Sequence, residues 1–284
     1  MQQYAAGFSG NPVGNSGDIK CRRHEIYVCS GRHQQANHVG RSGDAVKILL
    51  ALILLSRVSA LAQTFVSYTN FEDNSATTYS SVTATFSSGV TTGNLVACFL
   101  RFGNLGTGSS VTAALSGTGG DTFSGTTTVD GNNTTGMFYK VNAAGNSSYV
   151  ATATFTGGSP NYIAMVCGQY SGTATVSAFD QTAYGTATSG TCTTGTFTTT
   201  SANEVIIYGA SDGPTWVPGG GMTLRGVSGP NSVVMLSDIT VTSIQTGISE
   251  SASGQLFALM ECTVRTFIKA SSSPMVPRSK HVIF

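Results

Sequence analysis

The chain has 284 residues, a formal net charge of +1, 10% charged residues and 40% hydrophobic residues, so it can bury a core. This composition excludes disorder driven by excess charge. Residues 1–62 hold seven of the 14 basic residues and three of the 13 acidic residues. Residues 63–284 therefore hold seven basic and ten acidic residues, a formal charge of −3. This part of the chain has no basic stripe, so we expect no nucleic-acid binding.

An apolar run near the N-terminus is typical of a secretion signal. Residues 46–62 join a basic start at Lys47 to the apolar stretch Ile48–Leu55 and end in the small-residue motif Ala60-Leu61-Ala62. This order predicts a signal-peptide helix that is cleaved between Ala62 and Gln63. A buried helix or a membrane anchor is the alternative, but the run is too short to span a membrane of about 30 Å. We therefore expect no stable membrane span after cleavage.

Residues 1–45 precede that signal and are polar, without a periodic apolar pattern. We interpret them as a disordered, over-extended N-terminus, with translation beginning at Val46. A small metal site is the alternative, because this stretch holds the potential ligands Cys21, His24, Cys29, His33 and His38. Their spacing matches no common zinc pattern, so we expect no metal here.

From Gln63 onward, short strand-like runs alternate with turn residues. The expected strands are 64–68, 79–86, 94–100, 110–115, 122–129, 137–141, 149–155, 162–170, 193–200, 204–208, 222–227, 232–241 and 256–267. Many short strands, without amphipathic helices between them, favour an all-β protein over βαβ units. We predict a single antiparallel β-sandwich, jelly-roll or immunoglobulin-like, over 63–268, and a disordered tail over 269–284.

Four segments make the strand pattern more specific. Asn94–Leu100 is almost wholly apolar, which predicts a central strand buried on both faces. Asp130–Asn133 reads Asp-Gly-Asn-Asn and predicts a tight turn. Within 260–265 the even-numbered residues are apolar and the odd-numbered ones polar, so the even-numbered ones should face the core. Residues 185–203 are rich in Gly, Thr and Ser and predict a long loop with an edge strand.

Several short motifs follow one another in a recognisable order. They are Gly93–Val96, Tyr139 with Asn142, Gln169–Gly172, Thr200–Val205, Trp216–Arg225 and Thr266-Phe267. In this order, over 63–268, the chain resembles a group of uncharacterised exported bacterial β-sandwich domains of about two hundred residues. That group usually has Glu where this chain has Gln169, and a final-strand Trp where it has Leu256-Phe257. The resemblance implies export and fold class, and it brings no established activity or catalytic residue.

The predicted domain lacks histidine, because the four His residues stand at 24, 33, 38 and 281. This excludes a His-dependent triad, a His base and a His-ligated catalytic metal, so we expect a non-enzymatic domain without a cofactor. A glycosidase would need two carboxylates converging about 5–10 Å apart. The candidates are Glu72, Asp73, Asp121, Asp130, Asp180, Glu204, Asp212, Asp238, Glu250 and Glu261. Calcium near Asp121 or Asp130 has little support, because no spaced acidic loop motif is present.

Four cysteines follow the predicted cleavage site, namely Cys98, Cys167, Cys192 and Cys262. An even count in an exported protein permits two disulfides, with three possible connectivities. The alternative is that the three cysteines in apolar strands are small core residues. The sequence does not choose between these interpretations.

Trp216, the only tryptophan, precedes a Gly-rich turn and has Asp212 and Arg225 nearby in sequence. An exposed Trp here would offer a flat apolar face to a sugar ring. A Trp that covers one end of the core is the alternative that we favour, because large aromatic side chains are usually well buried.

We expect a secreted, periplasmic or cell-surface binding module whose partner is carbohydrate or another cell-surface or matrix polymer, by analogy at the level of the fold. The first alternative is a structural or adhesive subunit that assembles through edge strands. The second is the two-carboxylate glycosidase.

Overall fold

The computed structural model describes residues 63–103, 111–130, 133–187, 190–211, 213, 215–246, 251–253 and 260–269. The predicted leader over 46–62, the stretch 1–45 and the tail beyond 269 lie outside these residues, so their predictions stay untested. The described residues contain strands and no helix, which confirms the all-β prediction.

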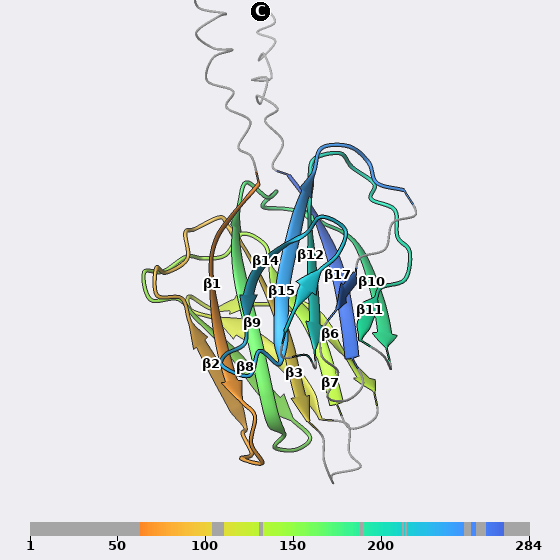
Figure 1. Ribbon diagram of the computed structural model, residues 1–284. Coiled ribbons are helices and arrows are strands. Elements are labelled where there is room, and N and C mark those ends of the chain that lie inside the picture. Colours follow the sequence, from red (N-terminus) through yellow and green to blue (C-terminus); the bar gives the residue numbers. More distant parts are fainter. Residues whose placement is uncertain are drawn as a thin grey trace, which may run out of the picture. The chain divides into compact units, whose positions relative to one another are not determined.

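Four antiparallel sheets contain the strands (Figure 1). Sheet I has the order β1 (Thr64–Asp73), β9 (Asn161–Ser171), β3 (Leu95–Gly103), β7 (Asn133–Lys140), β6 (Ser124–Asp130). Sheet II has the order β10 (Phe179–Ala187), β17 (Met260–Ile268), β12 (Glu204–Ser211), β15 (Val234–Val241), β14 (Thr223–Val227). Sheet III has the order β2 (Ser81–Thr85), β8 (Val150–Thr156), β4 (Thr112–Gly117), β5 (Asp121–Thr122). Sheet IV has the order β11 (Thr191–Thr193), β16 (Ser251–Ser253), β13 (Val217–Pro218).

Sheet I lies in the middle of the stack, with strand β3 at its centre. Every residue of β3 is buried, although successive side chains of a strand point to opposite faces. Cys98 and Leu100 pack into a first hydrophobic cluster with residues of sheet III, whereas Ala97 and Phe99 pack into a second cluster with residues of sheet II. The prediction of a central strand buried on both faces is therefore confirmed.

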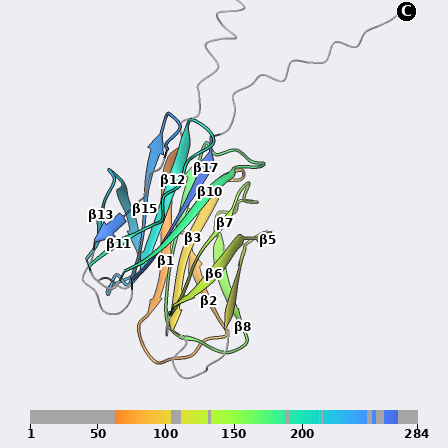
Figure 2. The ribbon, with the colours of Figure 1, turned by 90° about the vertical axis from the view of Figure 1, so that its right-hand side faces the viewer.

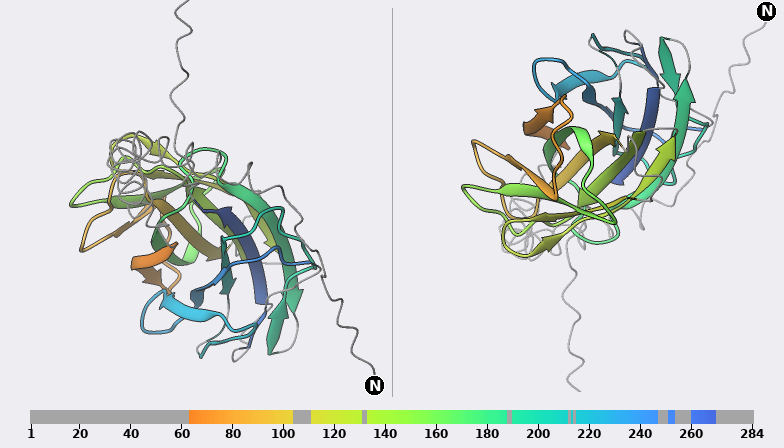
Figure 3. Two further views of the ribbon diagram at one scale, coloured as in Figure 1. Left: turned by 90° about the horizontal axis from the view of Figure 1, so that it is seen from above. Right: turned by 90° about the horizontal axis from the view of Figure 1, so that it is seen from below.

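Sheet II also has both faces covered. The side chains of Ile206 and Tyr208 point away from sheet I into a third cluster, together with Cys192 of sheet IV, Trp216 and Met222. Figure 2 shows β11 and β13 on one side of the stack and β5 and β8 on the other, and the end-on views of Figure 3 show the layers between them. Sheets I and II thus pack face to face, each carries a further sheet on its outer face, and the single β-sandwich stays a prediction. The jelly-roll or immunoglobulin-like description stays a prediction.

Several local predictions can be compared with the observed strands. Asp130 pairs with Asn133 at the end of the β6–β7 hairpin, as the turn motif predicted. The predicted strand 193–200 is wrong for the most part, because β11 ends at Thr193. Strand β10 was missed, since its sequence FDQTAYGTA contains Gly185 and has no regular apolar alternation.

The predicted polarity of the last strand is only half right. Cys262 is fully buried in the third cluster, as expected for the even-numbered face. The odd-numbered residues Thr263 and Arg265, which were not predicted to face the core, are also only 8% exposed. The reason is that sheet I covers the odd-numbered face of β17. Phe267 of that face packs into the second cluster, between sheets I and II, while β10 and β12 flank β17 within sheet II.

Candidate functional site

Trp216 lies in the third cluster and is only 8% exposed. Its indole Nε1 donates a hydrogen bond of 2.6 Å to the carbonyl oxygen of Ser232. A ring that is buried and hydrogen-bonded in this way offers no open face to a sugar, so the core-covering interpretation fits the structure. Asp212, the second residue of the predicted site, lies outside the described residues.

Arg225, the third predicted residue, lies on β14 and forms a bidentate ion pair with Asp238 of β15. The Nε–Oδ2 distance is 2.8 Å and the Nη2–Oδ1 distance is 2.9 Å. This hydrogen-bonded pairing raises the pKa of Arg225. Asp238 is almost completely buried, and Arg225 donates to both of its carboxylate oxygens. Among the described residues, no hydrogen bond, ion pair or ring contact joins Arg225 to Trp216, so the structure does not unite them in one site.

The contacts of Arg225 connect sheet I with sheet II. Its guanidinium lies over the ring of Phe65, with 4.9 Å to the ring centroid, and Phe65 makes an edge contact with Tyr170. Phe65 and Tyr170 belong to β1 and β9 of sheet I, whereas Arg225 and Asp238 belong to sheet II. Burial and then the Asp238 carboxylate raise the pKa of Tyr170, so its hydroxyl stays neutral. Arg225 therefore joins sheets I and II at one margin of the stack.

That same margin exposes apolar side chains on two neighbouring edge strands. Val66 and Tyr68 of β1 are 47% and 44% exposed, and Leu224 of β14 is 40% exposed. The ring of Tyr68 lies on Gly226 so closely that a Cβ at Gly226 would come within 2.8 Å of its Cγ. We call Val66, Tyr68 and Leu224 the edge surface. The sequence could not reveal it, because strand order is set by long-range pairing.

Strand β1 has its backbone hydrogen bonds on one side only. Among the described strands, it pairs with β9 alone, in the register Thr64↔Ser171 to Asp73↔Ile163. Residues 64–70 contain no charged residue and no proline. Natural proteins usually protect such edges with charges, proline or bulges, and here only a register shift between Phe65 and Ser67 is present.

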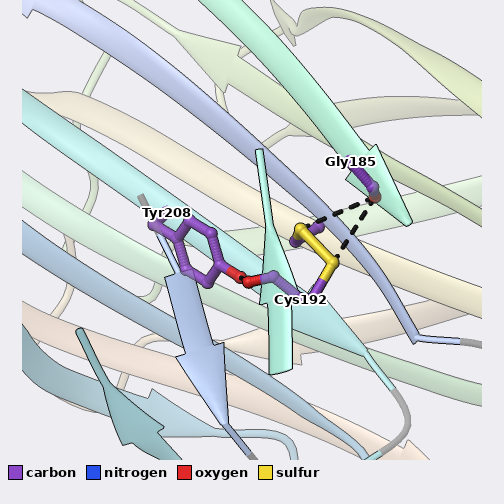
Figure 4. Close-up of a disulfide and its surroundings, with 4 residues drawn as sticks. Gly185, Cys192 and Tyr208 are labelled. Atoms are coloured by element: carbon purple, nitrogen blue, oxygen red, sulfur yellow. Dashed lines mark hydrogen bonds between the residues drawn. A yellow bond between two sulfur atoms is a disulfide. The ribbon is translucent and has the colours of Figure 1, made fainter. Parts of the chain in front are cut away.

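The four cysteines form two disulfides, as their even number permits. Cys98–Cys167 joins β3 to β9 within sheet I, where these residues are direct register partners. Cys192–Cys262 joins β11 of sheet IV to β17 of sheet II (Figure 4). Both of its sulfur atoms lie 3.5 Å from the carbonyl oxygen of Gly185, and these are sulfur–oxygen contacts because a disulfide carries no S–H. Disulfides are compatible with an oxidising, extracellular environment.

Two of the candidate carboxylates interact directly, namely Asp180 and Glu204. Glu204 is fully buried, so a sugar could not reach it across a cleft as a two-carboxylate glycosidase requires. Asp121, the candidate calcium ligand, instead accepts hydrogen bonds from the Tyr149 hydroxyl and the Ala144 amide, both of 2.9 Å. The side chain of Asp130 lies outside the described part of the structure. Within that part, no three or more His, Cys, Asp or Glu residues gather in a possible metal site.

The predicted cleavage site is only partly described. Ala62 lies outside the described residues, while Gln63 is buried and its Nε2 donates a hydrogen bond of 2.8 Å to the carbonyl oxygen of Phe267. None of the described segments is a helix with the length and apolarity needed to cross a membrane. Comparisons with protein-family models, with curated proteins and with solved structures found no match. The resemblance to exported bacterial β-sandwich domains therefore stays a prediction.

Proposed function

We propose that this chain is an exported, non-enzymatic β-sheet module that acts at a cell surface or in the extracellular matrix, and that it assembles with a second copy of itself through strand β1. The supporting observation is the open edge of β1, which carries the exposed side chains of Val66 and Tyr68. Unpaired amide and carbonyl groups along such an edge are a template for an added strand.

A second copy suits this edge for two reasons. Residues 64–70 are uncharged, so two identical segments can lie antiparallel without repulsion between like charges. A two-fold axis between two β1 strands brings the same patch of each copy together, which gives a closed dimer instead of an open filament. The exposed ring of Tyr68 and the side chain of Val66 would then lose contact with water.

An extracellular location is part of the proposal. It is supported by the signal-like sequence over 46–62 and by two disulfides, which persist in oxidising compartments. A binding module for carbohydrate or another surface polymer was the leading expectation from the sequence, and assembly through an edge strand was its first alternative. Of the three candidate binding residues, Trp216 is buried, Arg225 is paired with Asp238, and Asp212 lies outside the described residues.

The test is the oligomeric state as a function of protein concentration. Light scattering coupled to size-exclusion chromatography should show a monomer–dimer equilibrium for the wild-type protein. Val66→Lys should shift it to monomer, because a charge is placed on the pairing edge. Val176→Lys is the matched control, because Val176 is 76% exposed and lies between β9 and β10 instead of on an edge strand.

Two results would contradict the proposal. One is a wild-type protein that stays monomeric at all concentrations. The other is a dimer that Val66→Lys and Val176→Lys affect equally. Binding of the monomer to a glycan array would favour the carbohydrate alternative instead.

A further inference from the structure

A pair of carboxyl groups lies on the outer face of sheet II, at the end where β12 begins. Glu204 is the first residue of β12 and is fully buried. Asp180 lies on β10, and β17 runs between these two strands. Each carboxyl group shifts the pKa of the other, and a hydrogen bond from Thr266 of β17 lowers the pKa of Glu204.

The residues just before β12 supply hydrogen-bond donors to both carboxyl groups. The Thr200 amide donates to Asp180 Oδ2 over 2.7 Å, and the Thr200 hydroxyl also donates to Asp180. The Ser201 amide donates to Glu204 Oε1 over 3.0 Å. Glu204 Oε2 is buried and receives no donor. Within the described residues, no ion pair with Lys or Arg reaches either carboxyl group.

Two negative charges at this pair of carboxyl groups would be energetically unfavourable. A buried carboxylate oxygen without a donor is costly, and a second carboxylate beside it increases the cost. A proton on Glu204 Oε2 removes both costs, because the resulting O–H can donate to Asp180. We propose that Asp180 and Glu204 share one proton, and that loss of this proton releases segment 194–203 from the outer face of sheet II.

The pKa values agree with this geometry. Burial, and then the neighbouring Asp180, raise the pKa of Glu204 to about 7. Burial also acts to raise the pKa of Asp180, but the hydrogen bonds from Thr200 outweigh it and keep that pKa below its usual range. The groups that face the pair from β10, β17 and the 199–203 segment are Gln181, Thr266, Thr200 and Ser201, none of which carries a charge.

The proton step changes how segment 194–203 is held. As the pH rises, the O–H bond of Glu204 breaks, the proton passes to water, and the hydrogen bond between the carboxyl groups becomes a repulsion. The segment that this repulsion strains carries Phe197 into the third cluster. Its other attachments include the Gly195 amide, which donates over 2.9 Å to the Tyr184 carbonyl oxygen. Thr199 exchanges two hydrogen bonds of 2.9 Å with Gln245, and the Asn203 carbonyl accepts one of 3.0 Å from the Lys269 amide. Release would break these bonds and expose part of the third cluster.

The test is amide hydrogen exchange of Thr200 and Ser201, followed by NMR on the exported protein between pH 5 and pH 8. After correction for the intrinsic pH dependence of exchange, protection of the Ser201 amide should fall by about tenfold per pH unit between pH 5 and pH 7. Glu204→Gln keeps a permanent N–H donor toward Asp180, so its protection should stay constant over this range. Glu72→Gln is the control, because Glu72 holds the Asn231 and Val233 amides at a separate place and should leave the Ser201 response unchanged.

The carboxyl carbon of Glu204 should titrate near pH 7 in the same samples. Titration near pH 4.5, or an equal response of wild type and Glu204→Gln, would overturn the shared proton. Saturable binding of Ca²⁺ that removes the Glu204 titration would overturn it as well, since the pair would then be a cation site. If Glu204→Gln does not fold, the carbon titration of the wild-type protein decides alone.

Discussion

Gly209→Ala should destabilise the protein, because Gly209 of β12 lies against Phe99 of β3 where sheets I and II meet. A Cβ at Gly209 would come within 2.8 Å of Phe99 Cβ and closer still to its ring carbons. The Phe99 side chain is fully buried and has no space to withdraw. Overpacking a core in this way costs about 1–3 kcal/mol, and replacing Gly in a strand recovers about 0.5–1 kcal/mol. We expect a net loss of up to about 2.5 kcal/mol in the free energy of unfolding.

The assay is urea unfolding under oxidising conditions, with the midpoint and slope compared between variants. Gly195→Ala is the control, because its added Cβ would make only an ordinary contact of 3.6 Å with the Tyr184 carbonyl oxygen. Phe99→Leu supplies a rescue, since a smaller side chain leaves room for the methyl group. The double variant should then be more stable than the sum of the two single effects predicts. Equal midpoints for Gly209→Ala and Gly195→Ala, or strictly additive effects, would refute the close packing of sheets I and II at this point.

Three further predictions follow from other contacts. Replacing Cys192 and Cys262 with Ser should lower the free energy of unfolding by about 2–4 kcal/mol, because their bond closes a separation of 70 residues, and urea unfolding measures this. Gln169→Glu should cost about 1–3 kcal/mol in the same assay, because the buried amide Nε2 donates 3.1 Å to the Gly89 carbonyl oxygen and a carboxylate cannot. Glu204 stabilises the folded state fully below pH 4.5, and its contribution of about 3 kcal/mol is lost as the pH rises to about 7. Thermal unfolding of wild type should show this fall, while Glu204→Gln should not.

The parts of the fold that the sequence predicted are those set by local pattern. Strand β3 was predictable because both of its parities are apolar, which is typical of a strand between two other layers. The β6–β7 hairpin was predictable from Asp-Gly at its turn. Strand β10 gave no such signal, because it mixes Asp180, Gln181 and Gly185 with small polar residues and takes its place by pairing with β17.

The candidate site depended on information that a local pattern does not contain. Trp216 and Arg225 were candidate binding residues, and their hydrogen-bond partners Ser232 and Asp238 follow 16 and 13 residues later in a different strand or turn. The burial of Arg265 was not predicted, because alternation does not show whether a second sheet covers the polar face. From the sequence, Glu204 could not be distinguished from the other nine acidic residues of the predicted domain. The strand order of sheet II, which the sequence does not show, brings it beside Asp180.

The positions of the two disulfides bear on which part of β1 is open to a partner. Neither bond involves β1 or β14, so this margin is held by side chains alone. Phe65 and Tyr68 in the first half of β1 contact β14 through their rings, and two residues of the second half add hydrogen bonds. The Asn70 Nδ2 donates 2.9 Å to the Val227 carbonyl oxygen, and the Glu72 carboxylate accepts from the Asn231 amide over 2.9 Å and from the Ser228 hydroxyl.

The first half of β1 meets β14 through ring contacts, with Arg225 over Phe65 and Tyr68 on Gly226, and it contains the exposed side chain of Val66. Strand addition along residues 64–68 would leave the Asn70 and Glu72 contacts intact, whereas pairing over the whole strand would have to break them. The proposed dimer should therefore use a short contact at the start of β1. Such a contact is small, and small strand contacts are individually weak. A concentration-dependent equilibrium, in place of a permanent dimer, is the behaviour that this geometry favours.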